Sequence, residues 1–159
     1  YINGYSYTQF MKPLVVVPSG RRKIWEMNPN ARPTLAKNVY TGPPFKVNRE
    51  YAETFSDKWV ILSPKYGFIE PDFIISEDYN VRFNDPKTNP ILLSTLREQV
   101  KDRFSEYPCI VALGGSTYAN LVVETFKSTD QKVLTPSTGI MIARAVRDAI
   151  RENKPFTCT

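Results

Sequence analysis

The chain has 159 residues, of which 42% are hydrophobic and 23% are charged, and its formal net charge at pH 7 is +5. These values are ordinary for a globular domain with a core of its own, and the small basic excess suits an anionic partner such as nucleic acid or a nucleotide. The absence of histidine excludes His-based triads and His zinc sites, and no apolar run approaches the ~20 residues that span a bilayer, so no membrane partner is expected.

The first ten residues differ in character from the rest of the chain. Residues 1–10, YINGYSYTQF, are polar and aromatic and precede a Met-Lys-Pro that would make a natural start. We therefore expect an N-terminal extension over 1–10, of the kind that an expression vector adds, and a single α/β domain over 11–159.

Four short apolar runs predict buried strands. Residues 14–17, LVVV, are continuously apolar and β-branched, as in a strand that is covered on both faces. The same pattern recurs at 59–62 (WVIL), at 109–113 (CIVAL) and, more weakly, at 132–135 (KVLT).

Between these runs, apolar residues recur at the spacing of amphipathic helices. Thr95 and Glu98 have the spacing of a capping box, Ser116 is expected to open the third helix, and Asn153 with Pro155 is expected to end the fourth. The apolar faces of the four predicted helices are Val47, Tyr51, Ala52 and Phe55; Leu93, Leu96, Val100 and Phe104; Tyr118, Leu121, Val122 and Phe126; and Ile142, Val146, Ala149 and Ile150.

Strands that alternate with helices favour a parallel sheet. We predict an α/β fold, a single three-layer domain with a mostly parallel central sheet of four or more strands and helices on both faces. Two long irregular stretches, 20–44 and 64–90, are rich in Pro, Asn, Gly and charge. Loops of this length in a compact domain usually serve a function.

The four strand ends carry small and cationic residues, and ligands of open α/β sheets bind beyond the carboxyl ends of the strands. The loops are PSGRRK (18–23), SPKYG (63–67), GGSTY (114–118) and PSTG (136–139). Any one of them is ordinary turn chemistry, but together they predict an anion site with backbone amides and a helix N-terminus. The expected ligand-binding residues are Ser19, Arg21, Lys23, Ser63, Lys65, Tyr66, Gly67, Tyr79, Asn80, Gly114, Gly115, Ser116 and Tyr118.

Standard nucleotide motifs are missing from these loops. Gly114-Gly115 is not a G-x-G-x-x-G fingerprint, and no Walker lysine is present. A standard dinucleotide or P-loop site is therefore not expected, and no cofactor or resident metal is predicted.

Several motifs resemble known families. L-S-x-x-Y-G-x-x-x-P-x-D, at 62–72, is similar to a signature of the bacterial peroxide-stress protein YaaA family. Nearly everything after Met11 resembles a family of small uncharacterised domains of phages, archaea and bacteria, through VVVPSGRRKIW, AKNVYTGP, ILSPKYGFIEPD, DYNVRF and ALGGSTY. The resemblance implies an α/β fold and a nucleic-acid setting, because relatives are linked to DNA binding or base modification.

One departure from that family concerns Ser19. The family usually has Pro-Cys where this chain has Pro18-Ser19, and a related Pro-Cys-Ser stretch occurs in a domain of archaeal tRNA-modifying enzymes that handle deazaguanine bases. If the family cysteine is a nucleophile, Ser19 is a weaker substitute or an engineered replacement; if it is structural, Ser19 changes little. We favour a structural or ligand-lining Ser19, because no histidine is present to activate it.

Three functions are compatible with this sequence. The first is an enzyme acting on a base or its N-glycosidic bond, with Asp72, Tyr66 and Glu70 as expected catalytic residues and Ser19 as the alternative nucleophile position. The second is a non-catalytic module that binds DNA or a nucleotide. The least favoured is a metal-dependent nuclease using Asp72 and Asp85, because N-D-P-K at 84–87 is typical of a turn.

The two cysteines bear on the compartment. Cys109 and Cys158 are too few for a disulfide framework, and Cys158, next to the last residue, is expected to lie in a mobile tail. A reducing compartment is then the natural one, so we expect a cytoplasmic protein or one inside an infected cell.

Overall fold

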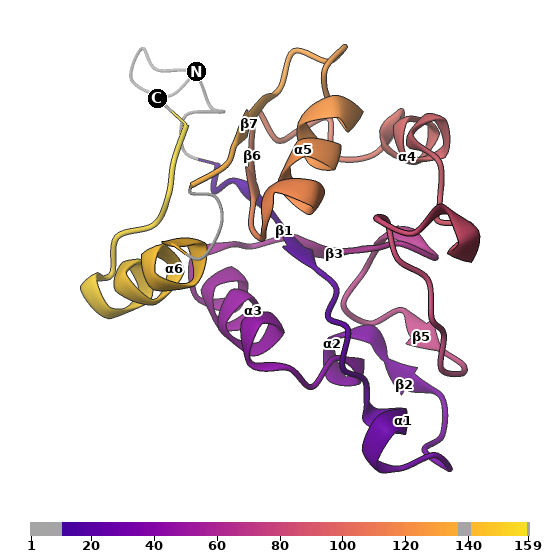
Figure 1. The fold of residues 1–159 in the computed structure, drawn as a ribbon. Helices are drawn as coiled ribbons and strands as arrows, with labels where there is room; N and C mark the ends of the chain where they lie inside the picture. Colours follow the sequence, from indigo (N-terminus) through magenta and orange to yellow (C-terminus); the bar gives the residue numbers. More distant parts are fainter. Residues whose placement is uncertain (1–10, 137–140, 159) are drawn as a thin grey trace, which may run out of the picture.

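The computed structural model describes residues 11–136 and 141–158, so the expected extension over 1–10 lies outside the described residues. Its centre is a five-stranded sheet in the order β4-β3-β1-β6-β7 (Figure 1). The strands β1 (Leu14–Pro18), β3 (Trp59–Ser63), β6 (Cys109–Ala112) and β7 (Lys132–Leu134) are parallel, and β4 (Gly67–Ile69) joins β3 antiparallel. The predicted mostly parallel sheet is confirmed.

Helices cover both faces of this sheet, as predicted. The helices α3 (Pro43–Phe55) and α6 (Met141–Glu152) pack together on one face, and α4 (Leu93–Val100) and α5 (Ser116–Thr125) pack together on the other (Figure 1).

The two faces follow from the alternation of side chains along a strand. In β1, Val15 and Val17 enter the core beneath α3 and α6, while Leu14 and Val16 enter the core beneath α4 and α5. A continuously apolar strand is therefore stable only where helices cover both faces of the sheet. This is why the LVVV run predicts a central strand.

The stretches expected to be irregular contain short elements. Besides β4, these are α1 (Ile24–Met27), β2 (Thr34–Leu35), α2 (Ala36–Val39), β5 (Ile74–Ile75) and a 3₁₀ turn, η2 (Pro86–Thr88). β2 and β5 pair antiparallel in a separate two-stranded sheet. Elements of two to four residues are too short to show a periodic pattern, so the sequence does not predict them.

Several predicted boundaries need correction. Leu92 is the N-cap of α4, so Thr95 lies inside the helix and the capping box with Glu98 is wrong. That helix ends at Val100, and Phe104 reaches the core from a turn with φ 67°. By contrast, α5 begins at Ser116, as expected, with Gly115 as its N-cap. The last helix ends at Glu152 just before Asn153, as expected.

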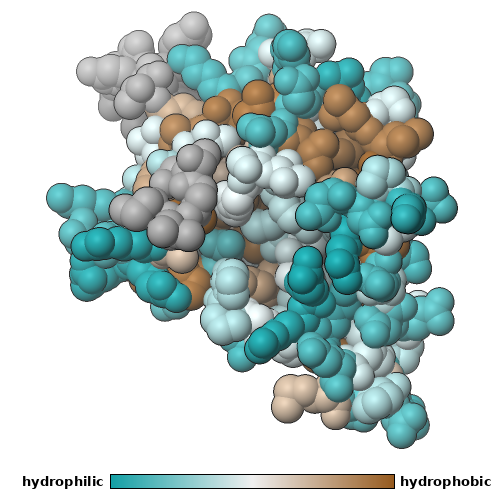
Figure 2. Space-filling view, viewed as in Figure 1, coloured by the Kyte–Doolittle hydropathy of each residue, from teal (hydrophilic) through white to brown (hydrophobic). Residues whose placement is uncertain are grey.

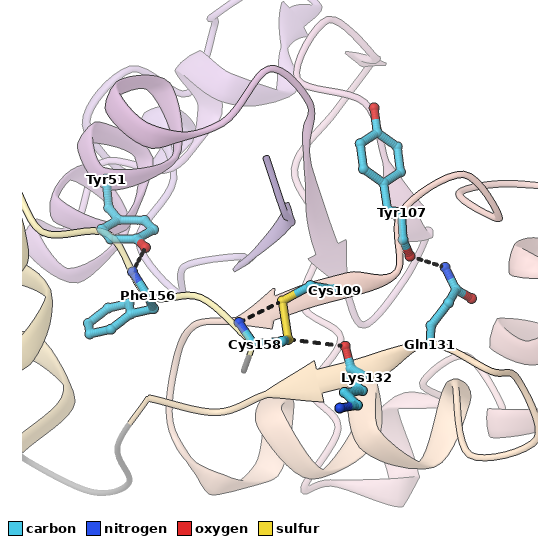
Figure 3. The surroundings of a disulfide bond; sticks show 7 residues. All are labelled: Tyr51, Tyr107, Cys109, Gln131, Lys132, Phe156 and Cys158. Carbon is cyan, nitrogen blue, oxygen red and sulfur yellow. Dashed lines mark hydrogen bonds between the residues drawn. A yellow bond between two sulfur atoms is a disulfide. The ribbon is translucent and has the colours of Figure 1, made fainter. Parts of the chain in front are cut away.

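The C-terminal segment is not the expected mobile tail. Cys158 forms a disulfide with Cys109 at the start of β6, and its backbone N–H donates to Cys109 Sγ at 3.3 Å (Figure 3). Phe156 stacks on Tyr51 of α3, whose hydroxyl accepts from the Phe156 N–H at 2.8 Å. The segment is therefore fastened to the domain at two places, and a reducing environment would open one of them.

Polar side chains cover most of the face seen in Figure 2, with apolar ones gathered over α5 and toward α4. Among the described helices, none has both the length and the apolar character needed to cross a bilayer.

Candidate functional site

The centre of the sheet is a point where neighbouring strands send the chain to opposite faces. β1 leads toward α3 on one face, whereas β6, which pairs directly with β1, leads into α5 on the other. The two loops diverge as they leave the sheet, and such a switch point is where doubly wound folds bind their ligands.

A cavity of about 610 Å³ lies at this point. Its walls are the loop after β1, the start of α5 and the segment 79–84, with Pro64 from the loop after β3. The lining residues are Ser19, Gly20, Arg21, Lys23, Pro64, Tyr79, Asn80, Val81, Arg82, Phe83, Asn84, Gly115, Ser116, Thr117 and Tyr118.

Two adjacent glycines shape the loop between β6 and the start of α5. Gly114 has φ +107°, a conformation that L side chains rarely adopt, and a Cβ built there would lie 2.6 Å from Pro18 Cγ. A Cβ built on Gly115 would meet no heavy atom within 4 Å. Gly114 thus allows the end of β6 to approach the end of β1 closely. Gly115 leaves the backbone beside the cavity without a covering side chain.

The start of α5 offers free donors to the cavity. Its N-cap, Gly115, has no side chain to bond the first-turn amides, and Gly115, Ser116, Thr117 and Tyr118 all line the hollow. The first N–H groups of a helix have no partner within the helix and carry a partial positive charge. This end of α5 is therefore suited to an anion.

The charged residues in the lining are all cations. Arg21, Lys23 and Arg82 line the cavity, and among the described residues no Asp or Glu does so. Arg21 and Arg82 are exposed, whereas the Lys23 residue is only 9% exposed. The electrostatic character of the cavity is thus positive, which attracts anionic ligands.

Lys23 is held by backbone oxygens. Its Nζ donates to the carbonyl of Tyr79 at 3.0 Å and, more weakly, to that of Arg21 at 3.4 Å, and it lies 4.3 Å from the centre of the Tyr79 ring. Burial lowers the pKa of Lys23, with the negative charge of Asp78 acting in the opposite direction.

Tyr79 anchors the 79–84 wall through a buried set of hydroxyl contacts. Its hydroxyl lies 2.6 Å from the Tyr40 hydroxyl and 3.0 Å from Ser63 Oγ, and Ser63 Oγ also accepts from the N–H groups of Lys65 and Tyr66 at 3.2 Å. Burial raises the pKa of Tyr40 and of Tyr79, so both phenols stay protonated at neutral pH.

We expect the substitution Tyr79→Phe to lower the free energy of unfolding by about 1–3 kcal/mol, since it leaves buried partners without one hydrogen bond. Urea unfolding followed by circular dichroism measures this change. The control is Tyr107→Phe, at a phenol that is only partly buried, where little change is expected. Equal unfolding midpoints for Tyr79→Phe and the parent protein would contradict the anchoring role.

Ser19 contacts Tyr118 within the cavity. Its Oγ lies 3.3 Å from the hydroxyl of Tyr118. Burial raises the pKa of Tyr118, with the Ser19 contact and Arg21 acting in the opposite direction, so Tyr118 is a neutral phenol and not a base. The structure therefore supplies Ser19 with no activating base at this contact, and a lining role agrees with the geometry.

The structure brings together many of the predicted ligand-binding residues. Lys65 is exposed and lies outside the lining, with its Nζ 5.7 Å from the centre of the Tyr79 ring. Tyr66 and Ser63 contact Tyr79 from outside the lining, and Gly114 lies against Pro18 before α5. Gly67 pairs with Ser63 in the sheet and lies beside Gln99. The predicted residues that line the cavity are Ser19, Arg21, Lys23, Tyr79, Asn80, Gly115, Ser116 and Tyr118.

Glu70 and Asp72 are not brought to the cavity, because β4 turns back along β3. Ser63 pairs with Gly67 and Ile61 with Ile69, so the chain runs away from the carboxyl ends of the strands. Glu70 lies 2.7 Å from Lys58 Nζ and 3.5 Å from Arg103.

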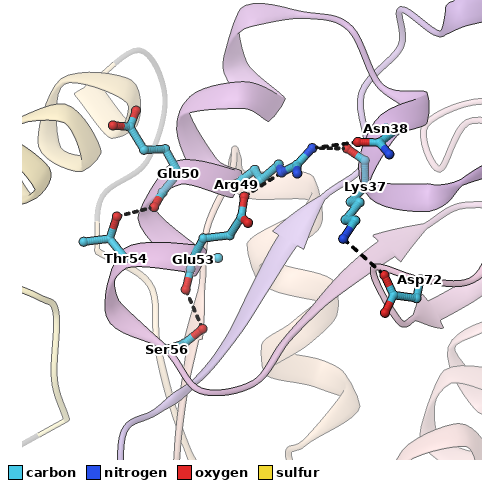
Figure 4. Close-up of polar contacts among 9 residues, drawn as sticks. Lys37, Asn38, Arg49, Glu50, Glu53, Thr54, Ser56 and Asp72 are labelled. Carbon is cyan, nitrogen blue, oxygen red and sulfur yellow. Dashed lines mark hydrogen bonds and ion pairs between the residues drawn. The ribbon is translucent and has the colours of Figure 1, made fainter.

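Asp72 lies in the turn that follows β4. Its side chain is 77% exposed and forms an ion pair with Lys37 at 3.3 Å, as the close-up shows (Figure 4). The expected catalytic set of Asp72, Glu70 and Tyr66 thus has no carboxylate in the cavity, and none of the three lines it.

Arg82 and Phe83 line the cavity but are not among the predicted ligand-binding residues. Both belong to the DYNVRF motif at 78–83, so a signal for them was present in the motif from which only Tyr79 and Asn80 were chosen. Gly20, Pro64, Val81, Asn84 and Thr117 complete the part that was missed. The predicted loop over 137–139 lies outside the described residues.

The two aspartates of the nuclease hypothesis have other partners. Asp85 caps η2 and accepts from the Lys87 N–H at 3.1 Å, which is the predicted turn, and Asp72 pairs with Lys37. Within the part of the chain that the structure describes, no three His, Cys, Asp or Glu side chains are grouped so as to hold a metal ion.

Fold and site together define a doubly wound α/β domain with a cation-lined cavity at its topological switch point. The chain belongs to a family of unknown function (DUF6884), whose sequence model matches residues 27–147. It is also 38% identical over 113 residues to the uncharacterized protein YfjM of Bacillus subtilis (strain 168), an alignment that covers 70% of this chain and 75% of that protein. No solved structure matches significantly.

Proposed function

We propose that the cavity binds a phosphate-bearing nucleotide, either free or as a unit of a nucleic acid. The observation that carries this proposal is the pairing of two arginines and a lysine with the uncapped start of α5 around one hollow that no described carboxylate lines. Backbone amides at a helix N-terminus and arginine guanidinium groups both bind phosphate well.

The rest of the lining suits a base and its sugar. Phe83 and Tyr118 meet edge to face with ring centres 5.3 Å apart, and Asn80 and Asn84 carry amides that both donate and accept. Aromatic rings pack against bases, and side-chain amides pair with base edges. The volume of about 610 Å³ lies inside the roughly 300–1,000 Å³ range of small-molecule sites.

Binding is favoured over cleavage of a glycosidic bond at this cavity. An oxocarbenium-like sugar needs a nearby carboxylate, and Glu70 and Asp72 are engaged elsewhere. The resemblance to the YaaA family and to a domain of deazaguanine-handling enzymes supports a nucleic-acid setting for the protein. Base modification or cleavage would therefore need a group brought by the substrate or by a partner. A nuclease role is not favoured, because the described residues contain no group of acidic side chains placed to hold a metal ion.

Replacing Arg21 or Arg82 by alanine should weaken nucleotide binding roughly 10- to 100-fold, since each substitution removes one charge-assisted contact of about 1.5–3 kcal/mol. Isothermal titration calorimetry with a panel of nucleoside monophosphates, their nucleosides and short single-stranded oligonucleotides measures this change. Lys65→Ala, at the rim, should cost less and reduce the salt dependence of binding.

Arg22→Ala is the matched control, because Arg22 is an exposed neighbour in the same loop that does not line the cavity. Native mass spectrometry of the protein purified from cells would identify a co-purifying nucleotide. The proposal fails if no member of the panel binds, or if Arg22→Ala and Arg82→Ala lose affinity to the same extent.

A further inference from the structure

Lys23 is an unusual buried lysine. Fully or nearly buried lysines are almost always paired with a carboxylate. Its Nζ has two backbone carbonyls as hydrogen-bond partners, and no ion pair joins it to a described carboxylate within 4.0 Å. Asp78 and Glu26 act on it only at longer range. Lys23 also lines the cavity, as do Arg21 and Tyr79, whose carbonyls hold its Nζ.

The surroundings of Lys23 favour its neutral amine more strongly than water favours the neutral amine of an exposed lysine. Burial is the main cause of its lowered pKa, and the positive charge of Arg82 acts in the same direction. A neutral lysine amine is a nucleophile toward carbonyl carbon, whereas the ammonium ion is not.

The cavity also holds a proton donor. Tyr118 lines the same hollow as a neutral phenol, and its hydroxyl contacts Ser19 Oγ. A phenol or a hydroxyl pair of this kind can give a proton to an oxygen that leaves and can take one back afterwards.

We propose that Lys23 forms an imine with the aldehyde carbon of a phosphorylated sugar whose phosphate is held by Arg21, Arg82 and the start of α5. This inference rests on the proposed function and names a chemical class for its ligand. The open-chain form of a pentose 5-phosphate carries both groups, and so does an abasic deoxyribose in a DNA strand.

The step balances without an oxidant or a cofactor. The Lys23 nitrogen attacks the aldehyde carbon, and the carbonyl oxygen takes up a proton to give a carbinolamine. The carbon–oxygen bond then breaks, the oxygen leaves as water with a second proton, and the nitrogen has given up two protons in total. Tyr118 can supply and recover the proton that the departing oxygen needs.

Reductive trapping tests the inference on the whole chain. The protein is incubated with ribose 5-phosphate, or separately with an oligonucleotide that contains an abasic site, together with sodium cyanoborohydride. The hydride converts any imine into a stable secondary amine, which intact-mass analysis counts and peptide mapping locates. The two probes distinguish a free sugar phosphate from a site in nucleic acid, and labelling by either one supports the proposal.

We expect one adduct per chain at Lys23, formed roughly tenfold faster or more than at the exposed Lys87. K23R should lose this adduct, and K87R should keep it. Unphosphorylated ribose should label Lys23 roughly tenfold more slowly, since it lacks the contacts of the phosphate.

Labelling spread evenly over the surface lysines of the parent protein would overturn the proposal without recourse to any variant. Equal rates of Lys23 labelling by ribose and ribose 5-phosphate would show that no phosphate site assists the reaction, and would overturn that part of the proposal. Nucleotide titration is read out separately: nucleotide binding by a protein whose Lys23 is not labelled refutes the imine alone, whereas rapid labelling of Lys23 without nucleotide binding refutes the proposed nucleotide ligand alone.

Discussion

Replacing Cys158 with serine should lower the free energy of unfolding by about 4 kcal/mol under oxidising conditions, on the chain-entropy account of a cross-link. The bond joins residues 49 positions apart, so it restricts a large loop of the unfolded chain. Urea unfolding of the variant and the parent, each with and without dithiothreitol, measures the difference.

Reductant is the internal control for this prediction. The parent protein in dithiothreitol should unfold at the midpoint of Cys158→Ser, and the variant should not respond to reductant. The remaining contact of the segment, between Phe156 and Tyr51, is present in both proteins. Equal midpoints for parent and variant under oxidising conditions would show that the cross-link does not form in solution.

The substitution Gly114→Ala should destabilise the domain by about 2–4 kcal/mol and abolish ligand binding in the cavity. A methyl group at this residue would combine a strained backbone, with φ +107°, and a 2.6 Å approach to the ring of Pro18. The loop between β6 and α5 would have to move, and it carries the amides that the cavity uses.

The neighbouring glycine makes a matched control for stability. Gly115 has φ −71° and open space beside its Cα, so Gly115→Ala should change the free energy of unfolding by less than about 1 kcal/mol. Thermal and urea unfolding of the two variants give the comparison. If Gly115→Ala is as destabilising as Gly114→Ala, the close contact with Pro18 is not the cause.

The elements that form the layers of this protein were predictable from local sequence. LVVV and WVIL are apolar at every position, and a strand of that kind is stable only when both of its faces are covered. The face of α3 that contains Tyr51 and Ala52 recurs at helical spacing, and this face is buried. Such patterns involve residues only a few positions apart, so they can be identified in the sequence without knowledge of any tertiary contact.

The loops at the strand ends could also be located from the sequence. In a parallel sheet every strand delivers its carboxyl end to the same edge, so Ser19, Gly115 and Tyr118 were expected together, and they line one cavity.

Only the tertiary structure decided which loop residues share that cavity. Glu70 and Asp72 stand a few residues after β3, but the antiparallel pairing of β4 carries them away from it. Lys23 and Tyr79 are 56 residues apart in the chain and meet through a hydrogen bond. The disulfide between Cys109 and Cys158 likewise joins residues that are far apart in the sequence. Contacts between distant residues depend on the direction of each strand and on the geometry of each turn. Neither of these produces a periodic pattern in the sequence, so neither could be predicted from it.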